Sequence, residues 1–140
     1  EVARVGLNEQ QAVAAGVPFT VTTYGADDLD RAIADGAAEG LVKVLTAPGT
    51  DRILGATIAG AHAADVLVEF VTAMKHGLGL NKVLGTIHTY PTMAEASKFA
   101  AGAWKRGTVT HGQHAVLTAF HAWRRGAGSL AEHHIDGLHA

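Results

Sequence analysis

The chain contains no cysteine among its 140 residues. It therefore has no thiolate nucleophile, no disulfide and no cysteine-ligated zinc or iron–sulfur site. Charged residues are scarce, at 17% against the usual ~25%, and the net charge of −2 provides no basic field for nucleic acid. The longest apolar stretch, residues 53–74, is interrupted by His62, Asp65 and Glu69, so we expect no membrane partner either.

Glycine, in contrast, is abundant: it accounts for 17 of the 140 residues, which exceeds the usual share of ~7%. A weakly charged surface rich in glycine and alanine suggests that another protein surface covers much of it. The length fits one domain that can bury a core without disulfides. The sequence begins at Glu1 with neither an initiator methionine nor a signal segment. We interpret it as part of a longer polypeptide. We expect a cytoplasmic location, with which the absence of disulfides is compatible although it does not decide the compartment.

The clearest local unit is a β-hairpin. Residues 41–46 and 52–58 are strand-like and flank Pro48-Gly49, which suits the centre of a type II turn. Gly55 and Gly60 mark a bulge or a place where another backbone comes close. We expect further strands over residues 2–5 and 19–24 and helices over residues 9–14, 27–33, 63–76, 81–85 and 92–105. This order predicts an α+β fold, an antiparallel sheet with helices packed on one face.

Two of these helices carry specific expectations. Asp27 is placed to cap the helical turn that runs to residue 33, as Asn8 caps the helix over residues 9–14. The helix over residues 63–76 is apolar nearly all round, which predicts burial on more than one side.

Residues 107–140 differ from the rest and are expected to form a separate extension after a domain at residues 1–106. Six of the nine histidines lie there. Val116, Leu117, Phe120 and Trp123 are spaced for one amphipathic helix. Metal binding is the alternative for the tail, through His111, His114, His133 and His134. No complete ligand set is evident, so we predict no metal site and a flexible polar tail.

The segment Ile87-His-Thr-Tyr-Pro-Thr-Met-Ala-Glu95 is the most informative in the chain. Pro91 forces Tyr90 to be extended. Thr92 and Glu95 are spaced as a capping box, in which the threonine hydroxyl accepts from the Glu95 amide and the glutamate accepts from the Thr92 amide. This predicts a rigid helix start that presents the Tyr90 side chain at a surface.

Three motifs in this order resemble one family. They are residues 1–9, the hairpin around residues 42–56, and Tyr90-Pro-Thr-Met-Ala-Glu95. Together they resemble the C-terminal dimerisation domain of the class I pyridine nucleotide-disulfide oxidoreductases, a group that includes dihydrolipoamide dehydrogenase, glutathione reductase and mercuric reductase. The resemblance covers residues 1–106.

The resemblance implies a homodimer whose FAD and NAD(P)H domains precede this one and carry the redox cysteines. It also implies that the Tyr90–Glu95 segment enters the partner subunit's active site. In the family a histidine of a His-Pro-Thr-x-x-Glu pattern exchanges a proton with thiols, and the glutamate orients it. Tyr90 and Glu95 would then be the catalytic residues, and Tyr90 and Pro91 would lie against the partner's flavin. The chain alone binds neither cofactor and is not expected to catalyse the reaction.

This sequence has Tyr90 where the family has histidine. A phenol with a pKa near ~10 is a poor base at neutral pH, whereas an imidazole near ~6.5 is a good one. Mercuric reductases are similar in this tyrosine, but they end in a cysteine pair that this chain lacks. We therefore favour a reductase-like relative of unassigned substrate. A stand-alone homodimeric interaction module and a histidine-rich metal-binding protein are the alternatives.

Each site residue also has a purely structural interpretation. Glu95 is explained equally well as a helix cap, and Tyr90 as a partly buried aromatic residue at an interface. His88, two residues before Tyr90, could act as a displaced base on the same side of an extended segment. A solvated or capped histidine is the more frequent case.

Overall fold

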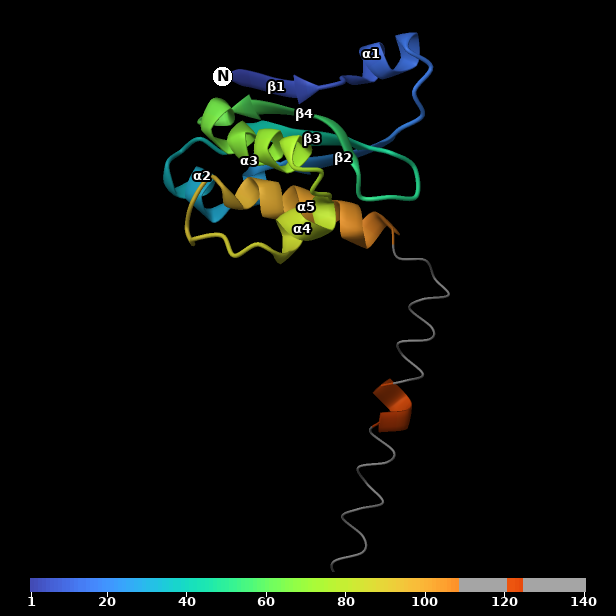
Figure 1. The fold of residues 1–140 in the computed structure, drawn as a ribbon. Coiled ribbons are helices and arrows are strands. Elements are labelled where there is room, and N and C mark those ends of the chain that lie inside the picture. The colour runs from blue at the N-terminus through green and yellow to red at the C-terminus, as the bar shows by residue number, and fades with distance from the viewer. Residues whose placement is uncertain (109–120, 125–140) are drawn as a thin grey trace, which may run out of the picture. The chain divides into compact units, whose positions relative to one another are not determined.

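The computed structural model describes residues 1–108 and 121–124. Its centre is one antiparallel sheet in the order β1-β4-β3-β2, built from β1 (Val2–Gly6), β2 (Thr20–Gly25), β3 (Gly40–Thr46) and β4 (Ile53–Gly60). The helices are α1 (Glu9–Ala14), the short 3₁₀ helix η1 (Ala26–Asp28), α2 (Asp30–Ala34), α3 (Ala63–Lys75), α4 (Leu80–Gly85) and α5 (Glu95–Thr108). Helices α3 and α5 lie on the same side of the sheet (Figure 1). The predicted α+β class is confirmed.

The core forms between these helices and one face of the sheet. Strand alternation puts Ala3, Ile58, Val42 and Tyr24 in one row across the four strands, on the covered face. This row belongs to a cluster that includes the fully buried Phe70 of α3. The other face carries a row through Arg4, Thr57 and Lys43 and is hollowed by about 540 Å³.

The hairpin between β3 and β4 forms as predicted. The Thr50 amide donates to the Ala47 carbonyl at 3.1 Å, and Gly49 has φ +70, as a type II turn requires at its third position. The expected close approach at Gly55 is also confirmed. A Cβ atom there would lie 2.0 Å from the Leu7 carbonyl oxygen, because the end of β1 crosses directly over this position.

The structure contradicts the prediction that Asp27 caps the helical turn that follows it. The segment divides into η1 and α2, and Leu29 is the residue that precedes α2, with extended backbone and no side-chain cap. Leu29 is only 1% exposed. Burial of this side chain is worth about 1.5–3 kcal/mol, more than the ~1 kcal/mol of a typical cap. Core packing therefore decides where the helix begins.

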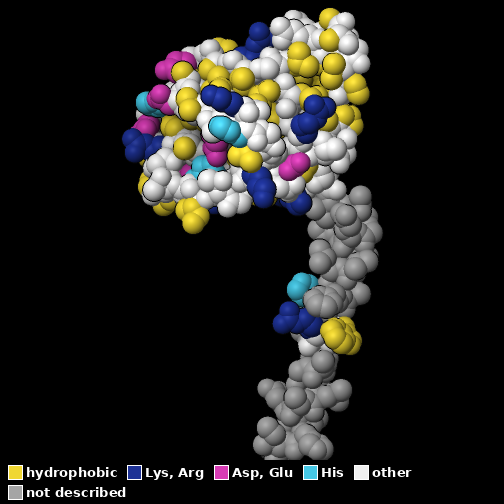
Figure 2. Space-filling view, viewed as in Figure 1, with side chains coloured by type: hydrophobic (Ala, Val, Ile, Leu, Met, Phe, Trp, Pro, Cys, Tyr) yellow, Lys and Arg dark blue, Asp and Glu magenta, His cyan; other side chains and the backbone are white. Residues whose placement is uncertain are grey.

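Among the described residues, helix α3 buries one face, and its other side is left exposed. Its buried side chains are Ala63, Val66, Leu67, Phe70 and Ala73. Val68 is 59% exposed and Val71 is 40% exposed on the other side. Hydrophobic side chains are visible among the charged ones on the surface (Figure 2). None of the helices in the described part of the chain is both long and apolar enough to cross a membrane.

Residues 1–106 form one compact unit. In the remainder, residues 121–124 form one helical turn with exposed side chains. The amphipathic helix expected through Val116, Leu117 and Phe120 lies largely outside the described residues. The four tail histidines named above also lie outside them.

Candidate functional site

Tyr90 lies in the connection between α4 and α5 and projects into solvent, with 69% of its surface exposed. Its hydroxyl donates a hydrogen bond of 2.8 Å to Oδ2 of Asp30, the first residue of α2. This bond raises the pKa of Tyr90, and the negative charges of Asp30 and Glu95 act in the same direction. The phenol therefore keeps its proton at neutral pH and acts as a hydrogen-bond donor.

Glu95 is buried, with 6% exposure, at the first turn of α5. Its Oε2 accepts from the Thr92 amide at 3.1 Å, which is one half of the predicted capping box. The other half is replaced, because the Thr92 hydroxyl donates to the Thr89 carbonyl oxygen at 2.7 Å instead. The helix consequently begins at Glu95 and not at Thr92. Glu95 thus fixes the backbone just after Pro91.

His88 occupies a different environment from Tyr90. Its side chain is only 5% exposed and both ring nitrogens have partners, so of the two forms expected from the sequence, solvated or capped, the structure shows the capped one. Nε2 lies 2.9 Å from Oε2 of Glu69 on α3, and Nδ1 lies 2.9 Å from the Thr86 carbonyl oxygen. Since both ring nitrogens already contact acceptor oxygens, His88 is not placed to act as a displaced base. Tyr90 and His88 are held by different helices, α2 and α3 respectively.

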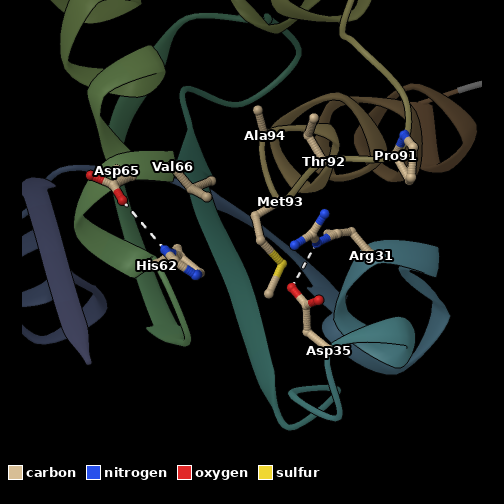
Figure 3. Close-up of a pocket in the computed structure, with 9 residues that line it drawn as sticks. All are labelled: Arg31, Asp35, His62, Asp65, Val66, Pro91, Thr92, Met93 and Ala94. Carbon is tan, nitrogen blue, oxygen red and sulfur yellow. Dashed lines mark hydrogen bonds and ion pairs between the residues drawn. The ribbon is translucent and has the colours of Figure 1, made fainter.

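A pocket of about 280 Å³ opens beside Pro91. It is lined by Pro91, Thr92, Met93 and Ala94, by Arg31 and Asp35 of α2, and by His62, Asp65 and Val66 around the start of α3. Figure 3 shows the Met93 thioether between the residues of α2 and those around the start of α3. Each of these two groups contains a paired basic and acidic side chain. Arg31 Nε lies 2.6 Å from Asp35 Oδ2, and His62 Nδ1 lies 3.5 Å from Asp65 Oδ2. The pocket offers an apolar floor between two polar rims.

Two features typical of metal and dinucleotide sites are missing, one from the described residues and the other from the pocket beside Pro91. Within residues 1–108 and 121–124, no three histidine, aspartate or glutamate side chains are grouped to hold a metal. The pocket beside Pro91 has no glycine in its lining, whereas dinucleotide sites rely on a glycine-rich turn to admit a pyrophosphate.

The sequence does not indicate Asp30 and Glu69 as partners of Tyr90 and His88. Asp30 is 60 residues from Tyr90, and Glu69 is 19 residues from His88. No local spacing rule connects residues at such separations. The only sequence feature that points to Asp30 is its acidic side chain at the start of α2. A favourable interaction with the helix dipole explains that feature equally well.

Tyr24 is a second tyrosine close to this site. Its ring packs on Phe99 of α5 with centroids 5.5 Å apart, and the residue is 9% exposed. Its hydroxyl has no hydrogen-bond partner among the described residues. Burial, followed by the charges of Asp28 and Asp27, raises the pKa of Tyr24 to about 12.

We expect Tyr24 in the folded chain to ionise near pH 12, against an ordinary value of 10.0. Because the folded-state pKa is raised, the stability from the neutral phenol is complete below about pH 10 and is lost as the pH rises to about 12. Ultraviolet absorbance titration of the Tyr90→Phe variant, in which Tyr24 is the remaining tyrosine, measures this. A midpoint equal to that of the urea-unfolded variant would contradict the prediction.

The sequence matches the family described as "Pyridine nucleotide-disulphide oxidoreductase, dimerisation domain" over residues 1–101. The dihydrolipoamide dehydrogenase of Chaetomium thermophilum is 41% identical over 103 residues, which cover 74% of this chain and 20% of that protein. The dihydrolipoyl dehydrogenase of Trypanosoma brucei brucei is 40% identical over 103 residues, covering 74% of this chain and 22% of that protein. The chain thus spans about a fifth of the length of these relatives.

Solved structures agree with the sequence comparison. The HOCl-induced flavoprotein disulfide reductase RclA from Escherichia coli aligns with a TM-score of 0.67 at 26% identity, covering 72% of this chain and 23% of that one. A NAD-dependent persulfide reductase from A. fulgidus aligns with a TM-score of 0.64 at 21% identity, over 76% of this chain and 20% of that one, and so shares the fold. The chain belongs to the dimerisation-domain family of the pyridine nucleotide-disulphide oxidoreductases.

Proposed function

We propose that this chain is the dimerisation domain of an FAD- and NAD(P)H-dependent, disulfide-reductase-like oxidoreductase. In this proposal two copies form a homodimer, and each presents the segment from Tyr90 to Glu95 to the active site of the other. The FAD and NAD(P)H domains belong to the same polypeptide as this domain. We also propose a cytoplasmic location, with which the absence of cysteine is compatible.

The observation that carries the proposal is the construction of the Tyr90 segment within a chain of this family. Tyr90 is exposed, while Glu95 is buried and binds the backbone at Thr92. A side chain held in this way suits a surface that a second subunit covers. The exposed Val68 and Val71 of α3 add apolar area for such a contact.

The cofactors are assigned to other domains, because the pocket lining described above does not form a dinucleotide cradle. Within this proposal Tyr90 and Pro91 of one subunit approach the flavin that is bound to the partner subunit. Tyr90 contributes a neutral hydrogen-bond donor there, because Asp30 keeps the phenol protonated. It supplies no general base at neutral pH, in contrast to an imidazole. Glu95 and Pro91 fix the direction in which the phenol points.

A chimera tests the proposal directly. Residues 1–106 replace the matching C-terminal segment of the dihydrolipoamide dehydrogenase of Chaetomium thermophilum, which is 41% identical over 103 residues. We expect the purified chimera to be a dimer that retains its flavin and oxidises dihydrolipoamide slowly. Analytical ultracentrifugation and flavin absorbance provide the first two readouts, and NADH formation provides the third.

The control is the host enzyme truncated before the replaced segment. If the chimera and the truncated enzyme are equally monomeric, the proposed dimerisation role is wrong. A dimer without any turnover, even after Tyr90→His, would favour the alternative of a stand-alone homodimeric interaction module. Retention of nickel or zinc by the 140-residue chain after chelation would favour the metal-binding alternative.

A further inference from the structure

The pair formed by His88 and Glu69 is a largely buried side-chain contact just before Tyr90, and nothing in the proposed function uses it. The His88 side chain is 5% exposed and that of Glu69 is 27% exposed. Both carboxylate oxygens lie close to Nε2, at 3.0 and 2.9 Å. The ring is therefore directed at the carboxylate group of Glu69.

The second ring nitrogen ties the same histidine to the backbone. Nδ1 lies 2.9 Å from the Thr86 carbonyl oxygen, which can only accept a hydrogen bond. An ionised Glu69 also only accepts, so the ring satisfies both contacts when both nitrogens carry protons. His88 therefore links α3 to the first residues of the connection between α4 and α5.

The connection between α4 and α5 is consequently held at both ends. At its start, the Thr86 hydroxyl donates to the Lys82 carbonyl oxygen at 2.8 Å, and His88 binds Glu69. At its end, Glu95 binds the Thr92 amide. Between these points the side chains face solvent, and Ile87 is 95% exposed. The Tyr90–Asp30 bond is the remaining side-chain tether, and it is exposed.

We propose that His88 and Glu69 are positioning residues that set the place of Tyr90. The proposal deepens the proposed function, and it rests on it in one respect, because the partner subunit is what receives the positioned Tyr90. The contact between His88 and Glu69 fixes the backbone two residues before Tyr90, so that the phenol reaches Asp30. Neither residue touches the reacting groups. When either partner is removed, the start of the connection loses its attachment to α3, and the exposed Tyr90–Asp30 bond breaks more often.

Nuclear magnetic resonance on the full 140-residue chain tests this without the chimera. The variants are His88→Gln and Glu69→Gln, and Asp30→Ala supplies the reference for a broken Tyr90–Asp30 bond. We expect both variants to move the Tyr90 ring carbon signal toward its position in Asp30→Ala. We also expect hydrogen exchange at the Thr92 amide to rise by about tenfold or more. Exchange at Val44, in the centre of the sheet, should not change, which separates a local effect from general destabilisation.

His76→Gln is the matched control, because His76 is an exposed histidine at the end of the same helix α3. The double variant His88→Gln/Glu69→Gln should be no more affected than His88→Gln alone, since His88→Gln already removes the contact with Glu69. Unchanged Tyr90 and Thr92 signals in Glu69→Gln would overturn the proposal, and this variant decides the matter if His88→Gln does not fold. A failed chimera would leave these signals unaffected, so the two proposals fail separately.

Discussion

Replacing Tyr90 with histidine in the chimera should raise its turnover with dihydrolipoamide by about 100-fold or more, the usual contribution of a positioned general base. The native phenol holds its proton at neutral pH, because Asp30 accepts its hydrogen bond and raises its pKa. An imidazole at the same place titrates near ~6.5 and can exchange a proton with a thiol. Glu95 is already buried and fixed a few residues away, as the family pattern requires of the orienting carboxylate.

Steady-state NADH formation measures this effect, with dimer content and bound flavin matched between proteins. Tyr90→Phe is the control, since it keeps the ring and removes the hydroxyl, and it should give no gain. An increase in kcat at unchanged KM would assign the gain to proton transfer. If the dimeric, flavin-loaded Tyr90→His chimera were no faster than its parent, Tyr90 would not occupy the position of the family histidine.

The Gly55→Ala variant of the chain should be less stable by about 3 kcal/mol, the upper part of the range for overpacking in a filled interior. The added methyl group would lie 2.0 Å from the carbonyl oxygen and 2.6 Å from the amide nitrogen of Leu7. These are backbone atoms, so no side chain can rotate away to make room. The chain beyond β1 must move instead, which breaks the 3.0 Å bond from the Leu7 amide to the Leu54 carbonyl oxygen.

Thermal unfolding followed by circular dichroism measures the loss, which corresponds to a decrease in Tm of more than about 12 °C for a domain of this size. Gly85→Ala is the matched control. A Cβ at Gly85, the last residue of α4, has nothing within 4 Å. Alanine is a better helix former than glycine there, so this variant should be neutral or slightly stabilised. Equal Tm values for the two variants would contradict the steric argument.

The fold follows from the sequence to the extent that local chemistry decides it. The Pro48-Gly49 turn and the close approach at Gly55 are properties of a few adjacent residues, and both are present as predicted. The start of α2 is not such a property. There the burial of Leu29 outweighs the capping preference of Asp27, and only the assembled core reveals which effect is larger.

The site is predictable in the same partial way. The spacing of Thr92 and Glu95 correctly indicates a carboxylate that binds the helix start. The direction of the Thr92 hydroxyl depends on the nearby Thr89 carbonyl, which the spacing rule does not consider. Asp30 is beyond any local rule, because the fold brings it to Tyr90 from another helix. The functional residues within the segment could therefore be named from the sequence. Its partners on other helices could be identified only from the structure.

The position of Glu1 has a practical consequence for protein engineering. Its backbone carbonyl accepts from the Gly60 amide at 2.9 Å, and its side chain accepts from the Ala64 amide at 3.2 Å, in the first turn of α3. Glu1 therefore serves as an anionic cap for a helix distant in sequence. An affinity tag fused directly before Glu1 would emerge at the start of α3, close to His62 of the pocket lining. Preparations intended for assembly assays should therefore carry a cleavable linker before Glu1.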